Sequence, residues 1–348
     1  MVELWFAIAA VMLTAYVVLD GFDFGAGALH LLVARTNEER RHVLAAIGPF
    51  WDGNEVWLLA AGGTLFVAFP KVLASCLSGF YFAIFLVLWA LILRGIAIEF
   101  RSHVGAPLWR SFWDVTFSVA SASLAVLFGA ALGNLIRGLP LDANGWFSLP
   151  LFTNFAPHDP VGILDWYTVL TGVFALAALT THGAAFLAWK TDGPVQERSR
   201  RVAARGFLVV AVLWPAITIA TRIAAPDFFA PFPSRPLAWL GGVAAVAGLA
   251  TLARATRRGL DRRSFLGSCT FLAGLMVATA ACMFPALLRS SGASSLAITA
   301  YTASNDRAGL TTAISWWCIG FPLAILYFVM VFWMHRGKVP VAAEGEGH

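Results

Sequence analysis

The chain has 348 residues, of which 59% are hydrophobic and 12% are charged. Soluble domains carry about 25% charged residues, so this composition excludes an ordinary soluble protein and indicates an integral membrane protein. The formal net charge of +5 is spread over several short segments. We therefore attribute it to membrane topology and expect no nucleic-acid partner.

Apolar segments of about 20 residues, the length that crosses a bilayer, recur along the whole chain. Nine of them lie at roughly 4–34, 51–74, 77–100, 112–136, 163–189, 203–223, 236–255, 265–288 and 309–335. The sequence thus predicts an all-α protein with nine transmembrane helices in a single domain, residues 1–338. Spans 1–4 and spans 5–8 each begin and end on the same side of the membrane. This arrangement permits two four-helix bundles, in halves 1–138 and 160–290, plus an additional helix at 309–335. Residues 339–348 are predicted to form a disordered tail.

Arginine and lysine are concentrated in alternate connections, at 35–41, 94–110, 190–205 and 254–263, and again at 336–338. The other connections carry far fewer cations, and positively charged residues favour the cytoplasmic side of a membrane. We therefore expect the N-terminus outside and the C-terminus inside. No basic segment precedes the first span, so we expect that span to stay in the mature protein.

The first span carries a polar stripe with helical spacing, formed by Tyr16, Asp20, Asp23, Gly27 and His30. Such a stripe must face protein or water, because an ionised carboxylate in hydrocarbon costs at least about 2.5–3.5 kcal/mol. Two interpretations stay open for the two aspartates. They are either structural, with hydrogen bonds to backbone or arginine at a helix break, or they belong to a proton or ion relay.

Three glycines in the same span are predicted to serve helix packing. Gly21 and Gly25 form a GxxxG step, which lets a neighbouring helix approach closely, and Gly27 follows them.

The second span begins with two acids, Asp52 and Glu55, among Trp51, Asn54 and Trp57. Asp52 would be the N-cap of this helix if Glu55 completed a capping box. Alternatively, a carboxylate just inside the cytoplasmic face would be the entrance of a proton pathway.

Arg94 lies in the third apolar run and needs a counter-ion, for which Asp23 and Asp52 are the candidates. A structural salt bridge and a catalytic role are both consistent with its position. Glu99 and Arg101 follow at the exit of this span. We predict a proton pathway through Asp52, Glu55, Asp23 and Asp20, supported by Arg94, Trp51, Asn54, Trp57, Glu99 and Arg101.

The chain offers few metal ligands. Its four cysteines are far apart and form no CxxC motif, and only His30 and His182 lie clearly inside spans. Heme and copper sites need convergent His, Met or Cys ligands. We therefore expect no heme ligand and no metal site in this chain.

Several strings of residues resemble those of one known family. Residues 20–27 (DGFDFGAG), 51–58 (WDGNEVWL), 78–81 (SGFY), 94–102, 133–138 (GNLIRG) and 333–338 are similar to subunit II of the cytochrome bd quinol oxidases, including the cyanide-insensitive type. The similarity covers nearly the whole chain in the same order.

The resemblance implies a heterodimer in the bacterial inner membrane, with quinol and dioxygen as substrates. In the family, subunit I holds two b-type hemes and heme d, or a third b-type heme, and dioxygen is reduced to water with cytoplasmic protons. Subunit II has two four-helix bundles plus one helix and ligates no heme. The family also implies a proton path through the acid that matches Asp52, with Asp23 as the other motif acid. A small single-helix subunit and a structural quinone or lipid are further expectations.

Two alternatives to this interpretation remain. Acids on glycine-interrupted helices also suit a proton-coupled secondary transporter. A purely structural subunit, which stabilises subunit I without carrying protons, is the other.

Overall fold

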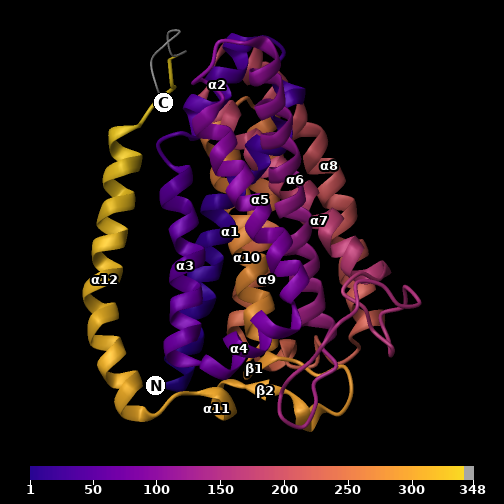
Figure 1. Ribbon diagram of the computed structural model, residues 1–348. Helices are drawn as coiled ribbons and strands as arrows, with labels where there is room; N and C mark the ends of the chain where they lie inside the picture. Colours follow the sequence, from indigo (N-terminus) through magenta and orange to yellow (C-terminus); the bar gives the residue numbers. More distant parts are fainter. Residues whose placement is uncertain (341–348) are drawn as a thin grey trace.

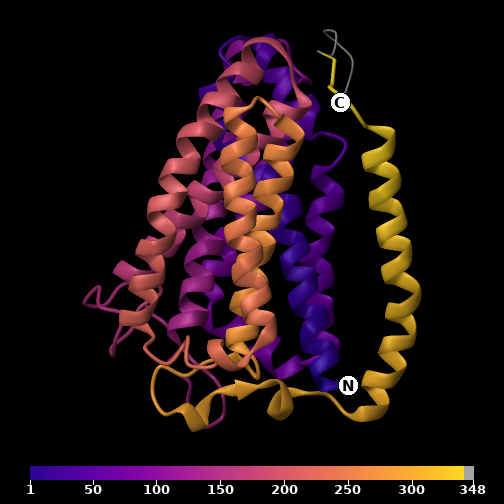
Figure 2. The same ribbon diagram turned by 180° about the vertical axis from the view of Figure 1, so that it is seen from behind.

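The computed structural model describes residues 1–340, which form a bundle of long helices aligned along one axis (Figure 1, Figure 2). The helices are α1 (Val2–Val33), α2 (Asn37–Ile47), α3 (Trp51–Ala68), α4 (Pro70–Gly79), α5 (Tyr81–Phe100), α6 (Pro107–Arg137), α7 (Trp166–Lys190), α8 (Gly193–Ala224), α9 (Pro236–Arg257), α10 (Asp261–Met283), α11 (Ala300–Ala303) and α12 (Arg307–Met334). Two short strands, β1 (Ala286–Leu288) and β2 (Ile298–Thr299), pair antiparallel. Two 3₁₀ turns complete the structure, at Phe232–Ser234 and Ser294–Leu296.

Eight helices among residues 1–340 are long and apolar enough to cross a membrane: α1, α5, α6, α7, α8, α9, α10 and α12. The prediction of a multi-pass, all-α membrane protein is thus confirmed. The predicted span 51–74 corresponds to α3, which ends at Ala68 and carries Asp52 and Glu55, and α3 is not among the eight. The count of nine and the orientation stay predictions.

The two ends of the bundle are closed differently. At one end, here called the α2 end, α2 begins with a complete capping box in which Thr36 and Glu39 exchange hydrogen bonds. At the opposite end lie α11, the two strands and the long connection 138–165 (Figure 1). Arg137 holds that connection to α6 by contacting Asp165, and it donates to Asn134 Oδ1 over 2.8 Å.

Helix α1 lies in the interior and packs against α3, α6, α7 and α10. Glycine makes its contact with α7 close, because a Cβ on Gly25 would overlap the carbonyl of Leu179. Helices α9 and α10 approach each other in the same way. A Cβ on Gly241 would lie 2.5 Å from the Ala278 nitrogen, and one on Gly274 would overlap the Ala245 nitrogen.

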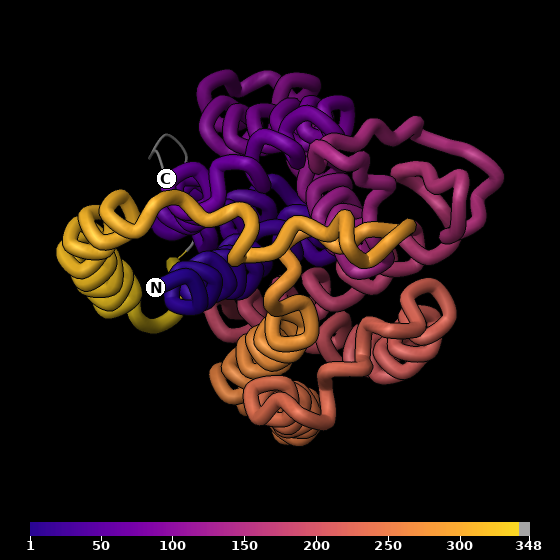
Figure 3. Tube along the Cα trace, turned by 90° about the horizontal axis from the view of Figure 1, so that it is seen from below, coloured from indigo at the N-terminus to yellow at the C-terminus, as the bar shows by residue number. Residues whose placement is uncertain are grey.

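Helix α12 stands at the edge of the bundle (Figure 1, Figure 3). Leu310 is its one buried residue among those described, and its carbonyl accepts a 3.3 Å hydrogen bond from Trp5 Nε1. At the other end, Lys190 of α7 donates to the carbonyl of His335. The chain continues to Val339, whose backbone N–H donates to Lys190 O over 2.8 Å. From residue 341 on, the predicted disordered tail lies outside the described residues.

Candidate functional site

Arg94 is the centre of a buried polar site that joins three helices. Its side chain is fully buried in α5, and Nη1 donates to Asp20 Oδ1 of α1 over 2.8 Å. Nη2 donates to Glu55 Oε1 of α3 over 2.5 Å. The guanidinium also lies 4.5 Å from the centre of the Phe24 ring. The predicted counter-ions, Asp23 and Asp52, were therefore wrong, because the registers of α1 and α3 bring their neighbours Asp20 and Glu55 to the arginine instead.

Asp23 lies beside this ion pair and is also fully buried. It accepts a 2.7 Å hydrogen bond from Asn54 Nδ2, which also donates to the carbonyl of Leu19 over 3.2 Å. One arginine thus faces three acids within a short distance along α1 and α3. We call Asp20, Asp23, Asn54, Glu55 and Arg94 the acid cluster.

The acid cluster has unsatisfied polar atoms. Among residues 1–340, buried atoms without a hydrogen-bond partner include Asp20 Oδ2, Asp23 Oδ1, Asn54 Oδ1 and Arg94 Nε. Buried polar groups in proteins are nearly always hydrogen-bonded, to protein or to ordered water. These four atoms can therefore accept or donate further hydrogen bonds. Glu55, with 26% of its side chain exposed, is the accessible acid of the cluster.

Asp52 is not part of this cluster. It is exposed, in the first turn of α3, whose N-cap is Phe50 without any side-chain capping bond. The interpretation of Asp52 as the N-cap is therefore wrong, because the helix begins two residues earlier than a capping box with Glu55 requires. Its position on the α2 side of the acid cluster still agrees with an entrance role.

The two tryptophans near these acids pack α3 against its neighbours. Trp57 is buried and its ring lies 5.4 Å from that of Phe328 in α12. The ring of Trp51 lies 3.4 Å from the position that a Cβ on Gly95 of α5 would take. Both residues thus hold the helix that carries Asn54 and Glu55, which agrees with a supporting role.

Arg101 belongs to a different site, which sequence reasoning missed. Its Nε donates to Asp114 Oδ1 over 2.5 Å, and Nη2 donates to Asn37 Oδ1 over 2.9 Å. The side chain of Asp114 is fully buried, and it also binds Arg40 Nη1 over 2.9 Å and His30 Nε2 over 2.7 Å. We call Asp114, His30, Arg40 and Arg101 the Asp114 cluster.

A sequence signal for the Asp114 cluster did exist. Asp114 is an acid near the start of an apolar helix, which is the criterion that singled out Asp52. The prediction that Glu99 and Arg101 support the acid cluster is wrong for Arg101, because the chain turns after α5 and carries it to Asp114. Glu99 is exposed at the end of α5.

The glycines of α1 face two different neighbours. Gly21 and Gly25 lie against Leu179 of α7, and a Cβ on Gly27 would overlap the side chain of Ser121 in α6. Close approach on both sides brings the polar face of α1 into the interior of the bundle.

The histidines of the spans are poorly suited to heme ligation. His182 uses both ring nitrogens, Nε2 with the carbonyl of Val18 at 2.9 Å and Nδ1 with Ser268 Oγ at 2.7 Å. Nε2 of His30 is taken by Asp114. Among residues 1–340, no group of three or more His, Cys, Asp and Glu side chains is arranged to hold a metal ion. A heme needs a free axial nitrogen or sulfur, which His182 does not offer, whereas Nδ1 of His30 has no partner in the described chain.

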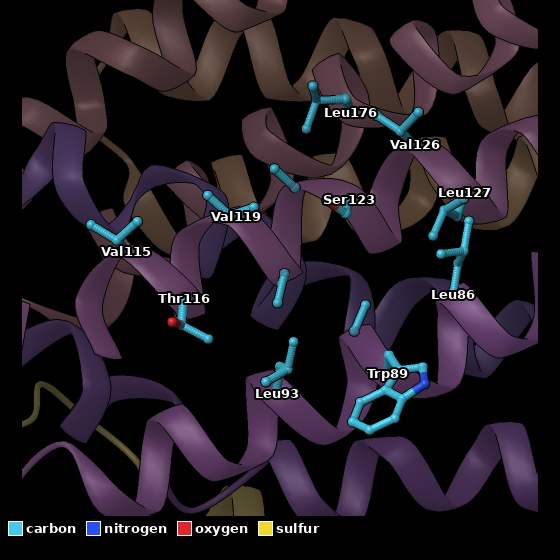
Figure 4. Close-up of a pocket in the computed structure, with 13 residues that line it drawn as sticks. Leu86, Trp89, Leu93, Val115, Thr116, Val119, Ser123, Val126, Leu127 and Leu176 are labelled. Carbon is cyan, nitrogen blue, oxygen red and sulfur yellow. The ribbon is translucent and has the colours of Figure 1, made fainter. Parts of the chain in front are cut away.

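Two apolar cavities lie away from the acids. One, of about 710 Å³, is a groove between α5 and α6 lined by residues such as Trp89, Val119 and Leu127 (Figure 4). The other, of about 700 Å³, lies among α6 to α10, and Tyr167 Oη and Thr221 Oγ1, 3.0 Å apart, provide polar atoms on its wall. Neither cavity is lined by a carboxylate or a basic side chain.

Comparisons with known proteins give a consistent result. The family described as cytochrome bd terminal oxidase subunit II matches residues 1–335. A Haemophilus influenzae protein described as probable cytochrome oxidase subunit 2 is 31% identical, over 97% of this chain and 94% of the relative. Subunit 2 of the Escherichia coli cytochrome bd-I ubiquinol oxidase is 29% identical over the same shares.

The fold also matches a solved structure. The bd oxidase of Geobacillus thermodenitrificans aligns with a TM-score of 0.74 at 16% identity, over 96% of this chain and 99% of that chain. This likeness shows that the two chains share a fold.

Proposed function

Because the chain belongs to the cytochrome bd terminal oxidase subunit II family, and is thus a membrane component of a quinol oxidase complex, we propose that it supplies protons for dioxygen reduction. In this proposal it works beside a heme-bearing subunit I, which it also stabilises. Electrons pass from quinol to dioxygen in the partner, and the acid cluster of this chain carries protons drawn from the cytoplasm.

The observation that carries this proposal is the charge balance of the acid cluster. Asp20, Asp23 and Glu55 share a single guanidinium, that of Arg94, inside the bundle. Uncompensated negative charge is costly in a membrane protein, so a site with more acids than bases favours the binding of protons.

The geometry supports an entrance at Asp52. Asp52 and Glu55 are one helical turn apart in α3, about 4.5 Å along the helix axis. From Glu55 the polar contacts continue through Arg94 to Asp20. The arginine-rich connections lie at the α2 end, so the positive-inside rule supports a cytoplasmic position for this end.

The hemes lie on subunit I in this proposal, which the contacts of both ring nitrogens of His182 and of Nε2 of His30 with protein partners support. The cavity among α6 to α10 has the apolar wall that a structural quinone or a lipid chain requires. The comparisons do not favour the alternative of a proton-coupled transporter.

The test of the entrance is the variant Asp52→Asn in the assembled complex. The amide keeps the size of the side chain but does not exchange protons, so we expect quinol-driven oxygen consumption to fall by about twofold. Heme content and copurification of both subunits should stay at the wild-type level, because Asp52 makes no hydrogen bond that holds the fold.

The matched control is Glu38→Gln, which removes another exposed acid at the same end of the bundle. It should retain wild-type turnover. If Asp52→Asn also turns over at the wild-type rate, protons do not enter at Asp52. If both variants slow equally, the effect is one of surface charge and the entrance is likewise rejected.

A further inference from the structure

The polar face of α1 connects the acid cluster with the Asp114 cluster. Asp23, Gly27 and His30 follow one another at intervals of four and three residues, so they lie on the same face. Helix α6 runs beside this face. It brings Ser121 against Gly27 and, two turns away, Asp114 against His30.

His30 has one ring nitrogen free for proton exchange. Its Nε2 lies 2.7 Å from Asp114 Oδ1, and Asp114 also receives hydrogen bonds from Arg40 and Arg101. A carboxylate that is held by two arginines acts as an acceptor, so the network assigns the ring hydrogen to Nε2. Nδ1 then presents a lone pair toward the interior, where it is buried without a hydrogen-bond partner among residues 1–340.

Two more buried polar atoms without a partner in the described chain lie along α1 from His30 to the acid cluster. They are Ser121 Oγ, at the level of Gly27, and Asp23 Oδ1. Asp23 and His30 are seven residues apart, about 10 Å along the helix axis, and Ser121 lies at the level of Gly27 between them. The ring of Phe117 lies 5.2 Å from that of His30, and its Cζ lies 3.0 Å from the position that a Cβ on Gly27 would take, so this ring packs between the two levels.

We propose that His30 is a proton-relay residue, which passes protons from the α2 end of the bundle along α1 to the acid cluster by way of Ser121. This inference rests on the proposed function, since it supplies a second entrance to the same proton pathway. Nδ1 accepts a proton from water and releases it toward Asp23, so the imidazole returns to its neutral form after each transfer. The proton is finally consumed when dioxygen becomes water.

The surroundings of His30 suit this role. Asp114 stabilises the transient imidazolium, as a carboxylate does for a histidine that acts as a base. The other charged groups that face His30 are Arg40 of α2 and Arg101 at the end of α5. The side chain of Arg40 is 26% exposed, so the Asp114 cluster reaches the surface at the α2 end.

The test compares two buried histidines in the assembled complex, His30→Gln and His182→Gln. Glutamine keeps a donor for Asp114 but does not exchange protons. We expect His30→Gln to lower the rate of oxygen reduction by about twofold, since the Asp52 entrance stays open, and to remove one titration step from its pH profile. His182→Gln is the control, because both nitrogens of His182 are already occupied by protein and no proton passes through them.

Three outcomes would overturn the proposal. Wild-type turnover in His30→Gln rejects the relay. An equal loss at every pH shows a structural role. Loss of a heme band in the reduced-minus-oxidised spectrum shows that His30 is a heme ligand.

If His30→Gln does not assemble, Ser121→Ala decides, because its hydroxyl makes no hydrogen bond within the described chain. A slowed rate with intact heme supports the relay, and an unchanged rate rejects it.

The double variant Asp52→Asn with His30→Gln separates this inference from the proposed function. Two parallel entrances predict a rate below that of either single variant. A rate equal to that of Asp52→Asn alone rejects the second entrance while leaving the first intact.

Discussion

At the scale of single residues, Arg94 determines how the acids of this chain are held. It binds Asp20 and Glu55 from two different helices, and all of its side chain is buried. Removing one partner of a buried ion pair typically costs about 3–5 kcal/mol, because the other charge is left without compensation. Arg94 thus stabilises the bundle. Asp23 makes no hydrogen bond with Arg94, and its side chain accepts one from Asn54 instead.

Glu39 allows a test of electrostatics outside the membrane spans. It accepts hydrogen bonds from Arg198 at 2.7 and 3.0 Å and from the backbone N–H of Arg35 at 2.6 Å. The bonds with Arg198 above all, and those with the backbone, lower the pKa of Glu39 from 4.5 to about 2. A lowered pKa in the folded state means that the ionised form stabilises the fold at higher pH. That stabilisation is lost as the pH falls from 4.5 toward about 2.

We therefore expect Glu39→Gln to lower the thermal unfolding temperature of the complex at pH 7, by a small amount because the pair is partly hydrated. The difference from wild type should shrink as the pH falls below about 4.5. Tryptophan fluorescence during heating, recorded over a pH series, measures it, with Glu38→Gln as the control. A difference that stays constant with pH would show that hydrogen-bond geometry, and not the charge of Glu39, supplies the stability.

The sequence identified most of the residues in the site but not how they pair. The cost of charge in a membrane singles out Asp20, Asp23, Glu55 and Arg94 individually. Their pairing depends on the rotation of α3 and α5 relative to α1, which helical periodicity along one chain does not determine. The partners of Asp114 could not be predicted from the sequence for the same reason, because they come from α1, α2 and the chain after α5.

At the scale of elements, the packing of α9 against α10 depends on glycine. A Cβ on Gly241 would lie 2.5 Å from the nitrogen of Ala278 and 2.7 Å from the carbonyl of Gly274, both of them backbone atoms. On the adjacent Gly242, a Cβ would meet only the Phe232 ring, at the ordinary distance of 3.5 Å.

Gly241→Ala should therefore separate the two helices and destabilise the protein by about 1–3 kcal/mol, as overpacking does. Gly242→Ala, its neighbour in the same helix, should be neutral or slightly stabilising, since alanine has the higher helix propensity. The thermal midpoints of the two variant complexes give the comparison. Equal midpoints would mean that the helices separate at little cost and that the close approach does not stabilise them.

Helix positions were predicted well where apolar length alone defines them, as for α9, predicted at 236–255 and found at Pro236–Arg257. Two boundaries differ for physical reasons. Helix α3 ends at Ala68, before 74, because Pro70 disfavours helical backbone at Phe69, whose φ and ψ are −139° and 59°. Helix α8 begins at Gly193, ten residues before the predicted 203, because its first turns are polar and escape a hydropathy criterion.

At the scale of the whole molecule, two buried polar clusters lie along α1 inside an apolar bundle. The Asp114 cluster lies toward the α2 end, and the acid cluster lies deeper along α1. Helix α1 is the shared element, since it contributes Asp20, Asp23 and His30. The two apolar cavities lie elsewhere, so proton-exchanging groups and apolar space are separated within the same fold.

Both proposed entrances lead to the acid cluster, in which Asp23 lies beside the Asp20–Arg94–Glu55 contacts. Asp23 therefore gives the most direct test of proton conduction by this chain. The measurement is proton uptake from solution during a single turnover of the fully reduced complex with dioxygen, in wild type and in Asp23→Asn. We expect uptake and oxygen reduction to slow together in the variant by about tenfold or more, with an unchanged reduced-minus-oxidised heme spectrum. Uptake at the wild-type rate, in a complex with its full heme content, would contradict the account and leave the acid cluster with a structural role.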